Sequence, residues 1–171
     1  MKKFELTSET KINIFGKKLF RIKALVSFGV VKTGETGGWV EKEENVNQSG
    51  DAWVFGNAEV FGNARVSGDA RVFDNAMVSG NARVFGNARV SGDAEVFGNA
   101  DYTTIHGFGT QFRTTTFFRC KDKQVKVSCG CFYGTIPEFR EQVKNTRDGK
   151  IAEEYLMIAD LMEKHFAEEA K

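Results

Sequence analysis

The sequence predicts a mainly β protein built around a parallel β-helix, and three observations lead to this prediction. A six-residue phrase repeats without interruption from Ala52 to Asp101, with a Val at every sixth position from Val54 to Val96. Within each repeat, the segment Ala-x-Val-x alternates in the period-two pattern of a short strand that has Ala and Val on one face. The next two residues are Gly-Asn or Gly-Asp, except at Asp74-Asn75, and these residue types favour sharp turns.

Strands this short cannot bury their inner faces alone, so successive turns must stack to form a continuous core. Three repeats, or 18 residues, would complete one coil of a triangular prism and place Val54 beneath Val72 and Val90. The phrase closely resembles the repeat of the hexapeptide-repeat proteins. This resemblance implies a left-handed parallel β-helix.

The residues on either side of each Val point outward, on three sides of the prism that we name side 1, side 2 and side 3. Five of the eight residues that directly follow a Val are Phe. Because large apolar groups repeated on an outer surface indicate interfaces, we expect a second subunit or the chain's own ends to cover these sides. The outward residues are Trp53, Phe55, Arg71, Phe73, Arg89 and Ser91 on side 1, Glu59, Phe61, Met77, Ser79, Glu95 and Phe97 on side 2, and Arg65, Ser67, Arg83, Phe85, Asp101 and Thr103 on side 3.

Residues 1–36 are expected to form an N-terminal β cap. Two alternating runs, residues 11–15 and 18–25, meet at Gly16-Lys17, which is a hairpin signal. Terminal repeats need such a cap to shield the core and the strand edges. The β-helix then occupies residues 37–106.

Residues 107–171 are expected to form a small α+β module, a β-hairpin plus two helices. We expect residues 102–105 to finish side 3 of a last coil and residues 106–110 to form an exit loop. Residues 113–120 and 124–133 flank a turn and predict the hairpin. Its second strand would carry on one face the side chains of Val125, Val127, Cys129, Cys131 and Tyr133.

Two helices should follow this hairpin. Thr135-Ile-Pro-Glu138 matches a capping box with Pro in the first turn, which predicts a helix over residues 136–146 that buries Phe139 and Val143. A second helix should begin after Asp148-Gly149, because apolar residues recur there at helical spacing.

Composition and charge exclude several classes of function. The chain has 171 residues, a net charge of +1 and a pI near 7.7, which gives no electrostatic footprint for duplex DNA or an anionic membrane. It contains no apolar run long enough to cross a bilayer, and its first residues lack the apolar core of a signal peptide. We therefore expect a soluble cytoplasmic protein whose three cysteines are reduced.

Both ends of the chain resemble uncharacterised hexapeptide-repeat proteins of phages and prophages. The resemblance rests on residues 19–25, 37–45, 50–54, 109–118, the segment Gly130-Cys-Phe-Tyr-Gly-Thr135, and Glu138-Phe139. It spans nearly the whole chain and implies a bacteriophage accessory protein in the host bacterial cytoplasm, although the family has no established reaction. This chain has Thr110-Gln111 and Arg147 where such proteins commonly show Ser-Arg and His.

Catalysis has one candidate residue. Many left-handed β-helices are acyltransferases that use a His as general base, but residues 40–104 contain no His. His106 lies just beyond the last expected coil and has no acidic partner near it in sequence. We interpret it as a loop or capping residue, with a catalytic base as the alternative.

The cysteines and one glycine-rich loop are the remaining candidates for a ligand site. Cys120, Cys129 and Cys131 do not have the spacing of zinc knuckles, so we expect buried thiols and neither metal nor cofactor. The loop that contains Gly109, Thr110 and Arg113 could expose backbone N–H groups and a guanidinium to an anion. The alternative is a plain connector.

The strongest functional signal is on the outer surface. Arginine and aromatic side chains occur together there, a combination that suits either a stacked nucleotide or a self-association interface, and we favour the second. The candidate ligand or interface residues are Trp53, Phe55, Phe61, Arg65, Arg71, Phe73, Met77, Arg83, Phe85, Arg89 and Phe97.

These observations lead to one functional hypothesis and two alternatives. We expect a homo-oligomer, a trimer by analogy with the fold relatives, that is a non-enzymatic phage accessory protein. It would bind a host protein or sequester a small nucleotide signal, for instance to inhibit host defence. The alternatives are an acyltransferase that uses coenzyme A, which the lack of a His in the coils disfavours, and a structural component of a virion or scaffold.

Overall fold

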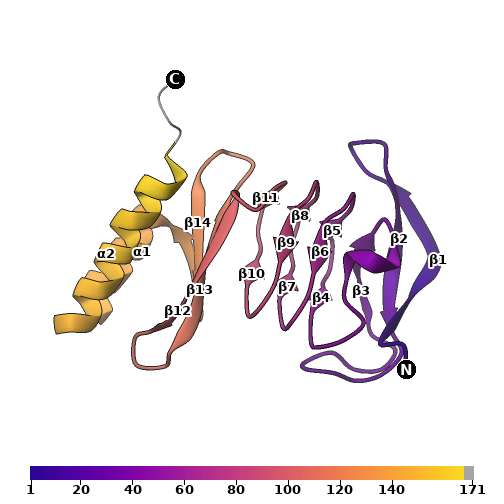
Figure 1. Cartoon of the computed structure of the whole chain (residues 1–171), viewed down its shortest axis with the longest axis horizontal. Coiled ribbons are helices and arrows are strands. Elements are labelled where there is room, and N and C mark those ends of the chain that lie inside the picture. Colours follow the sequence, from indigo (N-terminus) through magenta and orange to yellow (C-terminus); the bar gives the residue numbers. More distant parts are fainter. Residues whose placement is uncertain (168–171) are drawn as a thin grey trace.

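The computed structural model describes residues 1–167 and shows four parts in a row along its long axis (Figure 1). The N-terminal hairpin lies at one end, followed by the β-helix, an antiparallel sheet and two helices at the other end. No helix in the described residues is long and apolar enough to cross a membrane.

The β-helix consists of two-residue strands that stack in parallel at a spacing of 18 residues. Val54 pairs with Val72, and Val72 with Val90, so the predicted stacking is confirmed. The strands are β4 (Trp53–Val54), β7 (Arg71–Val72) and β10 (Arg89–Val90) on side 1, β5 (Glu59–Val60), β8 (Met77–Val78) and β11 (Glu95–Val96) on side 2, and β6 (Arg65–Val66) and β9 (Arg83–Val84) on side 3.

The core of the β-helix is formed by the repeated Val and Ala side chains. Every Val of the repeats is fully buried, and each Ala from Ala52 to Ala94 is at most 1% exposed. The backbone of each coil donates to the carbonyls of the next, as from Phe55 N to Val72 O at 2.7 Å and from Phe73 N to Val90 O at 3.0 Å. Burial and hydrogen bonding therefore both depend on the 18-residue register.

Corners of the coils are made by residues with positive φ. Gly56 has φ +58° and Gly80 has φ +61°, and Asp74 adopts φ +60° at the one corner that lacks Gly. The surroundings differ: a Cβ on Gly56 would meet nothing within 4 Å, whereas a Cβ on Gly80 would collide with the carbonyl of Phe97.

The N-terminal cap extends the sheet of side 2. Strands β1 (Phe4–Ile12) and β2 (Lys18–Ala24) form the predicted hairpin, and β3 (Thr36–Val40) joins it to β5 in the order β1-β2-β3-β5-β8-β11. A 3₁₀ turn, η1 (Glu43–Asn45), follows β3, and Val46 then forms a parallel bridge with Val66 on side 3. The cap thus covers the first coil.

Lys3 is a buried charge within this cap. It is 4% exposed, and its ammonium donates to the carbonyls of Gly50 (3.2 Å) and Ala52 (2.8 Å). Burial lowers the pKa of Lys3 from 10.5 to about 8, although the nearby Asp51 carboxylate acts in the opposite direction.

The chain after the β-helix forms a four-stranded antiparallel sheet, β12 (Tyr102–Phe108), β13 (Arg113–Arg119), β14 (Val125–Cys129) and β15 (Phe132–Thr135). The prediction that residues 102–105 complete side 3 is wrong, because β12 pairs with β13 instead. The prediction of an exit loop over residues 106–110 is also wrong, since β12 continues to Phe108.

The predicted second hairpin strand is broken into two. Gly130 has φ +61° and reverses the chain, so β14 ends at Cys129 and β15 returns antiparallel to it. Cys131 and Tyr133 are therefore exposed, and the prediction that they share the apolar face of Val125, Val127 and Cys129 is wrong.

β13 separates the two larger hydrophobic cores in residues 1–167. The side chain of Phe118 is fully buried in the core of the β-helix, and its neighbour Phe117 is fully buried against the helices. Because successive side chains of a strand point to opposite faces, β13 contributes one Phe side chain to each of the two cores.

Both predicted helices are confirmed as α1 (Ile136–Thr146) and α2 (Gly149–Phe166). Thr135 and Glu138 form the predicted capping box, and Phe139 and Val143 are buried. The helices cover the face of the sheet that lies away from the β-helix (Figure 1).

Two glycine variants test the packing of the corners. Gly56→Ala should lower the free energy of unfolding by about 1 kcal/mol, because a Cβ at positive φ is strained. Gly80→Ala should cost about 1–3 kcal/mol more, because its Cβ also meets a backbone carbonyl of the next coil. Urea denaturation of both variants measures the difference, and equal losses would contradict the stacked geometry.

Lys3 should make the stability depend on pH. Between about pH 8 and 10.5 the unfolded chain keeps the Lys3 proton that the folded chain has lost, so the free energy of unfolding rises with pH. The difference in stability between the wild type and Lys3→Met should therefore grow in favour of the wild type over this range. Lys2→Met, at an exposed neighbouring position, is the control; a Lys3→Met curve parallel to the wild type would refute the buried charge.

Candidate binding surface on side 3

The chain's own N-terminal segment covers Trp53 on side 1 and part of side 2. On side 1, Trp53 is fully buried and its ring contacts Phe4 and Phe28, with centroid distances of 5.8 and 5.3 Å. On side 2, the hairpin tip places Phe15 against Phe61 (5.6 Å) and Phe97 (6.2 Å). These contacts bury the side chains of Trp53 and Phe61.

Ion pairs hold the hairpin tip against side 2. The Glu59 carboxylate forms an ion pair with the Lys11 ammonium at 2.7 Å and accepts a hydrogen bond from the side-chain amide of Asn13 at 3.2 Å. Lys17 lies 3.3 Å from Glu41. Each surface ion pair is worth about 0–1 kcal/mol, so the apolar contact of Phe15 contributes at least as much to this arrangement.

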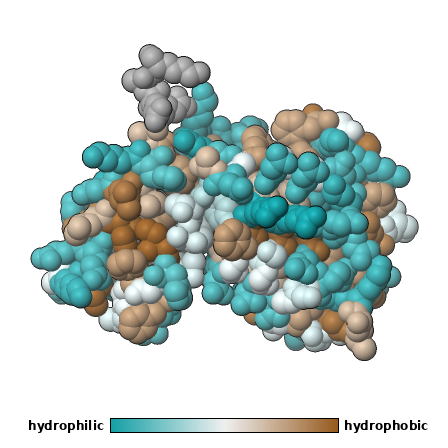
Figure 2. Space-filling model, in the orientation of Figure 1, coloured by the Kyte–Doolittle hydropathy of each residue, from teal (hydrophilic) through white to brown (hydrophobic). Residues whose placement is uncertain are grey.

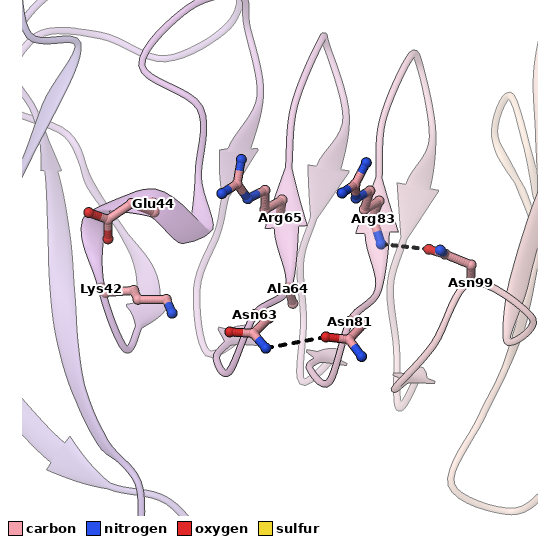
Figure 3. A pocket seen from close by; sticks show the side chains of 8 residues that line it. All are labelled: Lys42, Glu44, Asn63, Ala64, Arg65, Asn81, Arg83 and Asn99. Carbon is pink, nitrogen blue, oxygen red and sulfur yellow. Dashed lines mark hydrogen bonds between the residues drawn. The ribbon is translucent and has the colours of Figure 1, made fainter.

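Side 3 carries a groove of about 700 Å³ (Figure 3). Arg65 on β6 and Arg83 on β9 stand one above the other, because their strands are paired in register. Adjacent strands lie about 4.8 Å apart, so the two guanidinium groups can reach the same anion. The lining residues are Lys42, Glu44, Asn63, Ala64, Arg65, Asn81, Arg83 and Asn99.

A row of asparagines forms the corner along this groove. Asn63 donates from its side-chain amide to the oxygen of Asn81 at 3.2 Å, and Asn99 accepts from the backbone N–H of Arg83 at 2.9 Å. The amides thus have fixed orientations and keep further donor and acceptor positions free. Sequence reasoning missed these residues, although the 18-residue spacing of Asn63, Asn81 and Asn99 was a usable signal.

Phe85 lies on the same side and is 60% exposed. It lines a second hollow of about 700 Å³, together with Arg65, Arg83 and Ser67. Ser67 occupies the equivalent position one coil earlier. Phe85 is thus a single large apolar group on a surface that the repeat elsewhere makes polar.

The arginines of side 3 have no carboxylate partner. Within residues 1–167, no Asp or Glu oxygen lies within 4.0 Å of Arg65 or Arg83, whereas Arg119 is paired with Asp101 and Arg140 with Asp160. Glu44 shares the groove with them and reduces its positive potential. The groove remains net cationic, since Lys42 also lines it.

The remaining candidates on sides 1 and 2 are partly accessible. Arg89 is exposed, and its backbone N–H donates to the Thr116 hydroxyl at 3.0 Å. Phe97 is 39% exposed beside Phe15. The half-buried members of the predicted set are Phe55, Arg71, Phe73 and Met77.

His106 lies on β12 and is exposed, in a hollow of about 520 Å³ that also contains Arg89 and Arg113. Its Nδ1 is 3.3 Å from the hydroxyl of Thr114. A hydroxyl can hold the ring but does not stabilise an imidazolium as a carboxylate would. The geometry gives His106 no acidic orienting partner within this hollow.

The three thiols have different environments. Cys120 is buried, and burial raises its pKa to about 11, with the Asp122 carboxylate acting in the same direction. Cys129 is half-buried and Cys131 is exposed, so the prediction of buried thiols is correct for Cys120 alone. In residues 1–167, no group of three or more His, Cys, Asp or Glu side chains is placed to hold a metal ion.

The predicted anion-binding residues Gly109, Thr110 and Arg113 come together at one cavity of the C-terminal module. The structure adds two further residues to this cavity, Arg147 at the C-terminus of α1 and Tyr155 within α2.

Residues of both hydrophobic and hydrophilic character reach the surface of the protein. On the face shown in Figure 2, hydrophobic patches occur over both the helical end and the β-helix, and the surface between them is largely of intermediate hydropathy.

Comparison with known proteins adds to the repeat assignment. A family model described as YdcK Beta solenoid repeat matches residues 70–84 and 82–100, which span strands β7 to β11. No curated protein matches the chain. The matched repeats and the stacked parallel strands together identify a β-solenoid repeat protein.

Proposed function

We propose that the protein is a non-enzymatic binding protein that assembles into a homo-oligomer through side 3. The observation that carries this proposal is Phe85, which is 60% exposed on the side that the N-terminal cap leaves open. Burying a Phe side chain contributes about 1.5–3 kcal/mol, and arginine and aromatic residues are enriched in interfaces. If side 3 of each of three subunits met around a threefold axis, the assembly would be a trimer.

The same side supports a ligand proposal. The paired guanidinium groups of Arg65 and Arg83 suit a phosphate, the oriented amides of Asn63 and Asn81 suit the edge of a base, and the Phe85 ring suits stacking. A small nucleotide combines these three chemistries. We therefore propose that the groove, which would lie between subunits of the assembly, sequesters a nucleotide signal, in line with the phage accessory role that the sequence resemblance implies.

Oligomer formation can be tested with a matched pair of variants. Phe85→Ser installs the residue of the equivalent position, Ser67, and should shift the oligomer to monomer in native mass spectrometry. Phe73→Ser likewise installs the equivalent residue of side 1, Ser91, and should leave the assembly intact. A monomeric wild type, or equal effects of both variants, would rule out side 3 as the interface.

Nucleotide binding should raise the thermal stability of the full chain. With 5′-AMP or cyclic di-AMP at about 100 times its dissociation constant, the folded state gains about 2.7 kcal/mol, which a thermal-shift assay detects. Arg83→Gln should abolish the shift, while Arg71→Gln on side 1 should retain it. If neither nucleotide stabilises the wild type at millimolar concentrations, the groove does not bind this class of ligand.

A further inference from the structure

The geometry points to a second binding site inside the C-terminal module, for a small carboxylic acid with a short apolar tail. The site is a cavity of about 110 Å³ formed by the loop after β12, the start of β15 and the two helices. It shares no residue with side 3, so it stands independently of the proposed function.

Part of the cavity lining is apolar. Phe108, Phe132, Phe139 and Val143 line it, and the ring of Phe139 is fixed between Phe132 (5.5 Å) and Tyr155 (5.8 Å). A bare inorganic anion would leave this surface without favourable contacts, whereas a hydrocarbon group would bury it.

Two unpaired cations also line the cavity. Within residues 1–167, no carboxylate oxygen lies within 4.0 Å of the guanidinium of Arg113 or Arg147, although both side chains line the cavity. Arg147 ends α1, where its Nη1 donates to the carbonyl of Thr146 at 2.8 Å. Asp148 follows it in sequence without pairing to it. A site with two guanidinium groups beside apolar side chains favours an anion that carries a hydrocarbon group.

Two glycines allow the backbone to approach these groups closely. Gly109 has φ +74°, and a Cβ there would collide with the hydroxyl of Tyr155. Gly130 has φ +61°, and a Cβ there would lie 2.6 Å from Nη1 of Arg113. The loop at Gly109 thus packs directly on the Tyr155 hydroxyl, and the turn at Gly130 packs on the Arg113 guanidinium.

Tyr155 supplies a neutral hydroxyl in the wall. It donates to the carbonyl of Phe108 at 3.2 Å, which ties α2 to the end of β12. Burial and the neighbouring Cys129 raise the pKa of Tyr155, while the charges of Arg147 and Arg113 act in the opposite direction. The influence of Arg147 and Arg113 on this pKa agrees with the position of both guanidinium groups close to this wall of the cavity.

The size of the cavity limits the ligand. An apolar cavity of about 150 Å³ holds benzene, so 110 Å³ accommodates about four to six non-hydrogen atoms. Butyrate has this size, with its carboxylate at the arginines and its carbons on the phenylalanines. A nucleotide is far too large to enter.

Titration of the full chain with sodium butyrate, followed by ¹H–¹⁵N correlation spectra, tests the site. Saturable shifts should appear for the amides of residues 108–113 and 146–147. Arg147→Gln should weaken binding at least about tenfold, since a hydrogen bond to a charged group is lost. Arg71→Gln, on side 1 and outside both proposed sites, is the matched control and should bind butyrate like the wild type.

Three results obtained with the wild type would overturn the proposal. These are the absence of saturable shifts in the wild type, equal binding by 1-butanol, which lacks the charge, and equal binding by inorganic phosphate, which lacks the tail. Unchanged affinity in Arg147→Gln, with Arg113→Gln also unchanged, would likewise exclude the arginines as the anion-binding groups. Failure of nucleotide binding on side 3 would not affect any of these outcomes.

Discussion

The register of the stacked coils is the constraint on which the rest of this structure depends. Alternate backbone N–H groups of the repeats reach the carbonyl 17 residues ahead, as from Trp53 to Ala70, and this pairing holds because the coils of the repeat region have the same length. The same register places Val on Val inside and Arg65 on Arg83 outside. A groove lined by repeated side chains is therefore a direct consequence of the core.

The two ends of the chain determine which sides of the β-helix remain accessible. The N-terminal hairpin continues the sheet of side 2 and places Phe15 against Phe61, while Phe4 of β1 and Phe28 in the loop after β2 bury Trp53. At the other end, Phe118 of β13 closes the last coil. Side 3 keeps an open groove, which gives one face of a nearly symmetrical prism a different role.

The parts of the fold that repeat could be predicted from the sequence. A Val at every sixth position fixes the strands, the coil length and the residues of each side, and the capping box at Thr135 fixes the start of α1. The break at Gly130 was missed because a period-two pattern on both sides of a Gly suits one strand as well as two. The Phe15 contacts join residues far apart in sequence, for which no local pattern exists.

The candidate sites show the same division. Arg65, Arg83 and Phe85 were found from spacing alone, because a residue's position in the repeat determines the side on which its side chain lies. The proximity of Gly109 and Arg147, in contrast, depends on how the helices pack on the sheet.

Hydroxyl-radical footprinting of the assembled and the diluted protein tests the central role of side 3 most directly. Oxidation of Phe85 should fall on assembly while that of Phe97 stays constant; equal oxidation of Phe85 in both states, or protection of Phe97 instead, would contradict it.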